Sequence, residues 1–393
     1  MAHATPFRKQ AMCHGARRLE SLKIATAVWA LLNRRRMHLP TLVHRLAAGL
    51  LVLSAALPAA EIIRPKVVVV AMFEIGADTG DAPGEFQFWV EREKLDRVLP
   101  LPAAYHAVRA NSDGSVVGIV TGVGNSNAAA TIMALGLDPR FDLSKSYWLV
   151  AGIAGLDPAD ASVGSAVWAD YVVEGDLGHE IDAREIPADW KTGYVPLRKK
   201  KPYELPLQPA AERADNCYRL NPGLVQWAYA LTKDTPLLET AGIREFRARF
   251  PDYPAAQRPP SVLVGSTLSS STYWHGKLLN QWANDWVAYY TEDRGNFMTT
   301  AMEDTGTLRA LTNLTRAGRA DVNRVLVLRT ASNFDLQPAG FTAAESLAGE
   351  KIGHYSAFLP SLEAAHAVGS RVVHALVKDW SLYENSPPVA PTP

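Results

Sequence analysis

Cysteine is nearly absent from the sequence. The 393 residues include only Cys13 and Cys217, and only Cys217 would remain after the removal of an N-terminal leader. A mature chain with a single cysteine can form neither an intrachain disulfide nor a cysteine metal cluster. The histidines show no metal-ligand spacing such as HExxH, so the sequence predicts no metal site.

A net charge is also lacking. Lysine and arginine together number 40, and aspartate and glutamate together also number 40. Such a balanced chain has no overall field that attracts nucleic acid or an anionic membrane, so we expect no nucleic-acid partner. The hydrophobic share of 48% is that of an ordinary globular protein with a sizeable core.

Long apolar runs are missing after residue 60, so we expect no transmembrane span in the mature chain. An earlier apolar run over residues 46–57 follows the basic Arg45 and precedes small residues. This layout is typical of a secretory signal peptide over residues 37–60, which predicts an exported protein, periplasmic or secreted. Residues 1–36 are then an over-extended or disordered leader. The alternative for the apolar run is a buried helix at the start of the domain.

Apolar, β-branched runs alternate with helical segments along the rest of the chain. Strands are predicted over residues 66–73 and 116–121, and further strands lead into AGIAG (151–155) and TASNFD (330–335). This alternation indicates an α/β fold, in which ligands gather where strand ends open into loops. Residues 180–260, rich in proline and charge, are interpreted as an insertion. A closing helix is predicted over 356–380, with a disordered tail over 383–393.

Glycine-rich or polar clusters follow three of these strands. TGVGNSNAAA (121–130) and AGIAG are expected to form turns whose backbone N–H groups bind anions or hydroxyls. Glycine used only for tight packing is the alternative for both turns. TASNFD would bring Asn333 and Asp335 to the edge of the sheet, where an amide can pair with a heterocycle. The alternative there is an Asx turn.

An aromatic cluster precedes a predicted helix. STYWHG (271–276) groups Tyr273 with a tryptophan and a histidine, and these rings can either stack on a base or belong to the core. The helix that follows is expected to bury one face, formed by Leu278, Leu279, Trp282 and Trp286.

A pair of carboxylates stands at the start of another predicted helix. In TTAMEDTG (299–306), Glu303 and Asp304 precede leucines that recur at helical spacing. Acids in a first helical turn are stabilised by the helix dipole, which is a sufficient reason for both. A buried Glu303 would instead need hydrogen-bond donors, such as the vicinal hydroxyls of a sugar.

The motifs TLSSSTYWHG, FMTTAMEDTGTL and RTASNFD together resemble the purine nucleoside permease family of fungi and bacteria, over residues 63 to about 380. That family more remotely resembles the nucleoside phosphorylase and nucleosidase superfamily. The resemblance implies one nucleoside phosphorylase-like α/β domain over residues 61–382, with a central mixed, partly barrel-like sheet flanked by helices. It also implies a purine nucleoside as partner and a homo-oligomeric state.

The resemblance further implies roles for particular residues. Met302 packs against the ribose, Glu303 accepts hydrogen bonds from its 2′ and 3′ hydroxyls, and Asn333 binds the purine edge. Glu74 corresponds, to within one residue, to the acid that activates water or faces phosphate, and Asp335 would protonate or hold the ring. The other implied substrate-binding residues are Gly122, Gly124 and Asn125 on the ribose or anion side, Ala151 and Gly152 on the base side, and Tyr273.

The sequence departs from the superfamily at its phosphate site. Phosphorylases of the superfamily hold phosphate with arginines, and neither residues 148–150 nor the loop 76–84 contains one. This favours hydrolysis of the N-ribosidic bond, or binding without chemistry, over phosphorolysis. Phosphate stays open as a co-substrate, and no other cofactor is expected. The alternative to an enzyme is a purely non-catalytic nucleoside-binding component of transmembrane transport.

Overall fold

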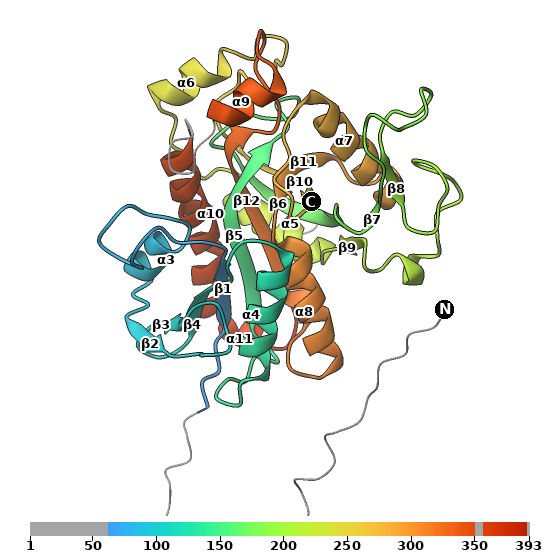
Figure 1. The fold of residues 1–393 in the computed structure, drawn as a ribbon. Coiled ribbons are helices and arrows are strands. Elements are labelled where there is room, and N and C mark those ends of the chain that lie inside the picture. Colours follow the sequence, from blue (N-terminus) through green and yellow to red (C-terminus); the bar gives the residue numbers. More distant parts are fainter. Residues whose placement is uncertain (1–61, 350–356, 391–393) are drawn as a thin grey trace, which may run out of the picture. The chain divides into compact units, whose positions relative to one another are not determined.

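The computed structural model describes residues 62–349 and 357–390 (Figure 1). The predicted leader and signal peptide lie outside the described residues. The strands are β1 (Val67–Ala71), β2 (Arg97–Leu99), β3 (Val108–Ala110), β4 (Val116–Val120), β5 (Tyr147–Leu156), β6 (Ala166–Glu174), β7 (Gly178–Glu180), β8 (Tyr194–Pro196), β9 (Cys217–Arg219), β10 (Val262–Ser269), β11 (Phe297–Ala301) and β12 (Val325–Phe334). The helices are α3 (Gln87–Arg92), α4 (Asn125–Leu137), α5 (Pro222–Thr232), α6 (Ala241–Arg247), α7 (Lys277–Thr291), α8 (Asp304–Arg316), α9 (Ala343–Gly349), α10 (Phe358–Lys378) and α11 (Trp380–Tyr383), with short 3₁₀ turns at Ala210–Glu212 and Val322–Arg324.

One large mixed sheet organises the described domain. Its strand order is β11-β10-β6-β12-β5-β1-β4-β3-β2, with β9 added beside β6. β11 also pairs antiparallel with β5, through Thr299 opposite Leu156 and Thr300 opposite Gly155. The strands β5, β12, β6, β10 and β11 therefore close on themselves as a barrel, and β1 to β4 extend the sheet from one side of it. The prediction of an α/β fold with a mixed, partly barrel-like sheet is confirmed.

β1 shows why the apolar runs form the centre of the sheet. Its sequence VVVVA is completely buried, and it runs parallel to β4 on one side and to β5 on the other. β-Branched side chains suit a strand that is covered on both faces, so the strand predicted over 66–73 is confirmed.

Helices flank the sheet (Figure 1). α10 packs on β5 and β12 with the predicted face of Leu362, Ala365, Val368, Val372 and Leu376 buried, which confirms the closing helix. α4 and α8 pack against each other, and a Cβ on Gly306 would lie 2.1 Å from the carbonyl oxygen of Asn125. Glycine therefore lets the first turns of these two helices meet. No helix within 62–349 or 357–390 has the length and apolarity needed to cross a bilayer.

Two strands, β5 and β12, end later in the sequence than predicted. β5 continues to Leu156, so AGIAG is strand and not a turn, because its backbone pairs with β12 and β11. β12 continues to Phe334, so most of TASNFD is also strand. The small residues of β5 are used for close packing: a Cβ on Gly152 would meet the side chains of Met72, Glu85 and Arg329.

The predicted insertion and tail also need correction. Within residues 180–260, β9 pairs with β6, and α5 contributes Leu224, Val225 and Ala228 to the main core, so this part belongs to the domain body. The start of the predicted tail contacts the domain, since the Tyr147 hydroxyl donates to the Tyr383 carbonyl at 2.7 Å.

One residue of the expected core face of α7 is exposed. Leu278 lies in the first turn of the helix with 85% of its surface accessible, whereas Trp282 and Trp286 are buried as predicted.

Candidate functional site

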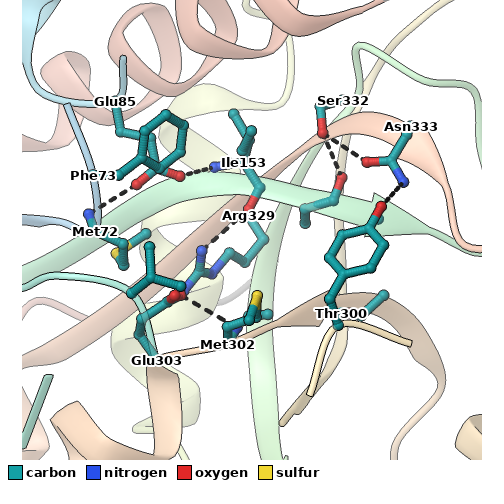
Figure 2. A pocket seen from close by; sticks show the side chains of 15 residues that line it. Met72, Phe73, Glu85, Ile153, Thr300, Met302, Glu303, Arg329, Ser332 and Asn333 are labelled. Carbon is teal, nitrogen blue, oxygen red and sulfur yellow. Dashed lines mark hydrogen bonds and ion pairs between the residues drawn. The ribbon is translucent and has the colours of Figure 1, made fainter. Parts of the chain in front are cut away.

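A pocket lies where the carboxyl ends of β5, β11 and β12 meet the loops that follow β1, β4 and β10. Figure 2 shows Glu85, Arg329 and Glu303 grouped on one side and Ser332 and Asn333 on the other. We refer to these as the charged end and the neutral end. The lining residues are Met72, Phe73, Glu85, Val123, Ile153, Ala154, Gly155, Tyr273, Thr300, Ala301, Met302, Glu303, Arg329, Ser332 and Asn333.

Glu85 reaches the charged end from the loop after β1. Its carboxyl oxygens accept hydrogen bonds from the backbone N–H groups of Met72 at 2.8 Å and Ile153 at 2.7 Å. Burial raises the pKa of Glu85 to about 8, with Glu303 adding to the rise and Arg329 opposing it. A carboxyl group with a pKa near neutrality can both give and accept a proton under physiological conditions.

Glu303 faces the same space from the residue just before α8. Its Oε1 accepts from the Gly124 N–H at 3.1 Å, and its Oε2 accepts from the Met302 N–H at 3.2 Å. Only 4% of Glu303 is exposed, and this burial raises its pKa. Each of its oxygens keeps acceptor capacity, so a ligand hydroxyl can be bound there.

Arg329, on β12, is the cation of the charged end. Its guanidinium binds both carboxyl oxygens of Asp304, donates to the Ile153 carbonyl at 3.1 Å, and lies 3.5 Å from Glu303 Oε2. Burial opposes its charge, but the surrounding carboxylates raise its pKa above the usual value.

Asp304 therefore forms an ion pair with Arg329 in addition to its favourable interaction with the dipole of α8. It is the first residue of α8, as predicted, but it is completely buried and forms the main ion pair of Arg329. A buried carboxylate needs such a partner because it has lost its hydration.

The neutral end is built around the Asn333 amide. The Ser332 hydroxyl donates to Asn333 Oδ1 at 2.8 Å, and Asn333 Nδ2 donates to the Tyr273 hydroxyl at 3.2 Å and to the Phe334 carbonyl at 3.1 Å. Asn333 is 5% exposed, whereas Tyr273 is 43% exposed. An amide, a hydroxyl and an aromatic ring form a surface suited to a flat heterocycle.

The structure brings together four of the sequence-predicted site residues, Tyr273, Met302, Glu303 and Asn333, in the lining of this pocket. Gly122, Gly124, Ala151 and Gly152 are not among the lining residues, but Gly124 supplies a backbone N–H to Glu303 and Gly152 leaves room for Glu85.

Asn125 has a different position from the one expected. Its Oδ1 accepts from the Thr305 hydroxyl at 3.0 Å and from the Gly306 N–H at 2.9 Å, so it joins α4 to the start of α8.

Glu74 and Asp335 also lie outside the lining. Glu74 accepts hydrogen bonds from backbone groups of its own loop. Asp335 follows β12 and accepts from Asn280 Nδ2 at 3.1 Å, and burial raises its pKa well above the usual value, with Asp157 adding to the rise. Within the described ranges, no group of three or more metal-binding side chains is arranged to hold an ion, and the absence of a metal stays a prediction.

Sequence reasoning missed Glu85 and Arg329. Glu85 stands eleven residues after Glu74 in a loop whose path follows no periodic pattern. Arg329 offered a clearer signal, because a lone arginine inside the apolar run VLVLRTA must find buried anions.

The family described as purine nucleoside permease matches residues 64–388, and the chain belongs to this family. A protein of Schizosaccharomyces pombe named "Probable purine nucleoside permease" is 29% identical over 86% of this chain and 99% of its own length. A purine nucleoside permease of Candida albicans is also 29% identical, over 82% of this chain and 78% of its own length.

Solved structures with a similar chain path include a 5′-methylthioadenosine/S-adenosylhomocysteine nucleosidase of Neisseria meningitidis. It is 14% identical, covers 80% of this chain and 100% of its own, and has a TM-score of 0.44. The corresponding nucleosidase of Streptococcus pneumoniae is 14% identical, covers 79% and 99% of the two chains, and has a TM-score of 0.45.

Proposed function

We propose that the pocket binds a purine nucleoside and hydrolyses its N-ribosidic bond. The observation that carries this proposal is the division of the pocket. Glu85, Glu303 and Arg329 lie at one end, and the amide of Asn333 with the ring of Tyr273 lies at the other. A nucleoside has the same division, since a polyhydroxylated sugar is joined to a flat, nitrogen-rich base. The purine nucleoside permeases named above support the choice of ligand.

In this proposal the ribose lies at the charged end. Glu303 accepts hydrogen bonds from the 2′ and 3′ hydroxyls, and Met302 packs against the sugar ring. Hydrogen bonds to a charged acceptor contribute about 1.5–3 kcal/mol each, so Glu303 provides much of the affinity. The purine lies at the neutral end, against Tyr273 and Asn333.

Glu85 is the proposed general base. Its carboxylate takes a proton from a water molecule, and the water oxygen forms a bond to C1′ as the C1′–N9 electron pair leaves with the purine. The purine anion then takes up a proton from solvent and Glu85 releases its proton to solvent, so that ribose and free base are the products. Positive charge develops on the sugar in the transition state, and the Glu303 carboxylate stabilises it. The Tyr273 hydroxyl, held in place by Asn333 Nδ2, donates a hydrogen bond that stabilises the negative charge on the leaving base.

Water is a better nucleophile for this site than phosphate. Among the described lining residues Arg329 is the one cation, and its guanidinium already binds Asp304 with both Nε and Nη2. A phosphate dianion in the pocket would lie near the acids Glu85 and Glu303 and a single arginine, and the repulsion from the two acids disfavours its binding.

The test is to incubate residues 61–393 with inosine and with adenosine, with and without phosphate, and to measure free base by chromatography. We expect base release that does not depend on phosphate. Glu85→Gln should lower kcat by at least about 100-fold while calorimetry shows nucleoside binding retained, because a general base contributes 10²–10⁴-fold. Glu303→Ala should lose both binding and cleavage. No base release by the wild-type protein would overturn the hydrolase.

A second candidate is a nucleoside-binding component of transport without chemistry. The related proteins of Schizosaccharomyces pombe and Candida albicans, both named as purine nucleoside permeases, favour it. Nucleoside binding by calorimetry without any base release, unchanged in Glu85→Gln, would support this function instead. The signal peptide predicted from the sequence leads us to propose export for either function.

A further inference from the structure

We infer that Glu74 is a positioning residue that holds the Glu85 carboxyl group in the pocket. This inference rests on the proposed function, in which Glu85 acts on the reacting atoms. Glu74 does not line the pocket, and its carboxylate acts through the loop that carries Glu85.

The Glu74 carboxylate accepts hydrogen bonds from both ends of this loop, and we call this set of hydrogen bonds the clasp. Its Oε1 accepts from the N–H groups of Ile75, at 2.8 Å, and of Gly84, while its Oε2 accepts from those of Phe86 at 2.8 Å and Gln87 at 2.6 Å. A carboxylate that accepts several backbone N–H groups forms strong, charge-assisted hydrogen bonds. One side chain thus binds the backbone on both sides of Glu85.

The backbone of Glu85 itself is also fixed by a hydrogen bond. Its N–H donates to the carbonyl of Phe73 at 3.1 Å, so the N–H groups of four consecutive residues, 84 to 87, all bind either residue 73 or residue 74. This leaves the Glu85 backbone little freedom, and its side chain points to the amides of Met72 and Ile153.

Gly84 makes the clasp sterically tight. A Cβ built on Gly84 would lie 2.7 Å from the Glu74 Cα and 2.8 Å from Glu74 Oε1. Any larger residue at position 84 would push the loop segments around Glu74 and Gly84 apart. Gly84→Ala therefore opens the clasp without changing a charged group.

Catalysis is sensitive to this placement, since a displacement of about 1 Å can cost about 100-fold in rate. In Glu74→Gln the amide nitrogen faces backbone N–H donors and can accept from none of them. The Glu85 carboxyl group should then sample positions outside the pocket. Residues that contact the sugar and base would be unchanged.

The test compares wild type with Glu74→Gln, Gly84→Ala and a control, Asp81→Asn. Asp81 lies in the same loop, and its carboxylate accepts from the Ala77 N–H at 2.9 Å. Its backbone carbonyl, which this substitution keeps, accepts from Gln87 Nε2 at 3.2 Å. We expect Glu74→Gln and Gly84→Ala to lower kcat by about 10–100-fold, with the nucleoside Kd within about threefold of wild type. Asp81→Asn should change neither value. A merely structural role would move the unfolding midpoint without this split between kcat and Kd.

A second arm is independent of catalysis. Hydrogen exchange of residues 84–87 is expected to accelerate at least tenfold in both variants, and the infrared titration of Glu85, identified by its loss in Glu85→Gln, should shift. Unchanged exchange together with an unchanged Glu85 titration would overturn the inference. If wild type releases no base, the proposed hydrolysis fails, and this second arm still decides the role of Glu74.

Discussion

The charged and neutral ends of the pocket differ in how their polar groups are held. At the charged end, Glu85, Glu303 and Arg329 are all at least nine-tenths buried and bind one another, Asp304 or nearby backbone groups. At the neutral end, Asn333 has uncharged partners and Tyr273 is 43% exposed. A buried ionic network is sensitive to the loss of any member, whereas an uncharged hydrogen bond contributes only about 1 kcal/mol. Substitutions at the charged end should therefore lower stability and activity far more than substitutions at the neutral end.

The largest effect is expected from Arg329→Met. Removing the cation leaves Asp304 and Glu303 buried without their partner, which costs about 3–5 kcal/mol of unfolding free energy. The measurement is urea unfolding followed by tryptophan fluorescence. Ser332→Ala at the neutral end is the matched comparison and should cost about 1 kcal/mol. Equal losses in the two variants would contradict the difference between the two ends.

The pH dependence should come next in size. Glu85 has a pKa of about 8 and must be deprotonated to act as a base. Below pH 8 we therefore expect kcat/KM to rise about tenfold per pH unit, and to level off above it. A flat profile from pH 6 to 9 would contradict the assignment.

The same group also affects stability. Because its pKa in the folded protein lies above the usual 4.5, protonated Glu85 favours folding at low pH, and this contribution is lost as the pH rises through about 8. Glu85→Gln should remove that loss, as unfolding curves at pH 6 and 9 would show.

The smallest effect is expected at the neutral end. Tyr273→Phe keeps the ring but removes the hydroxyl that Asn333 contacts. We expect nucleoside affinity to fall about fivefold, which corresponds to about 1 kcal/mol. Stability should stay within about 0.5 kcal/mol of wild type, since the side chain is partly exposed. A loss above 100-fold in calorimetry would place Tyr273 on a level with the charged end.

Much of the fold followed from local patterns. The apolar run of β1 and the spaced leucines of α8 are buried as their sequence indicated, because burial on one or two faces leaves a direct periodic trace. The spacing of these leucines also marks the helix start at which Glu303 stands, but its place in a binding site was implied by the resemblance to the purine nucleoside permease family.

The position of Glu85 in the pocket could not be predicted from a local pattern. The loop between β1 and α3 has no period, and its path depends on contacts with Glu74 and with β5. The glycines of AGIAG were expected in a turn for a related reason. A glycine that permits a turn and a glycine that makes room for another side chain look alike in a sequence, and only tertiary packing separates them.

The antiparallel pairing of β11 with β5 closes the barrel through two residue pairs, and Thr300 and Gly155 from this short seam also line the pocket. The strands that complete the cylinder are thus the ones a ligand would touch. Under the proposed function, a nucleoside bound over the seam would contact both strands and so favour their pairing. Ligand binding should therefore make the whole barrel more rigid through the pairing of β11 with β5.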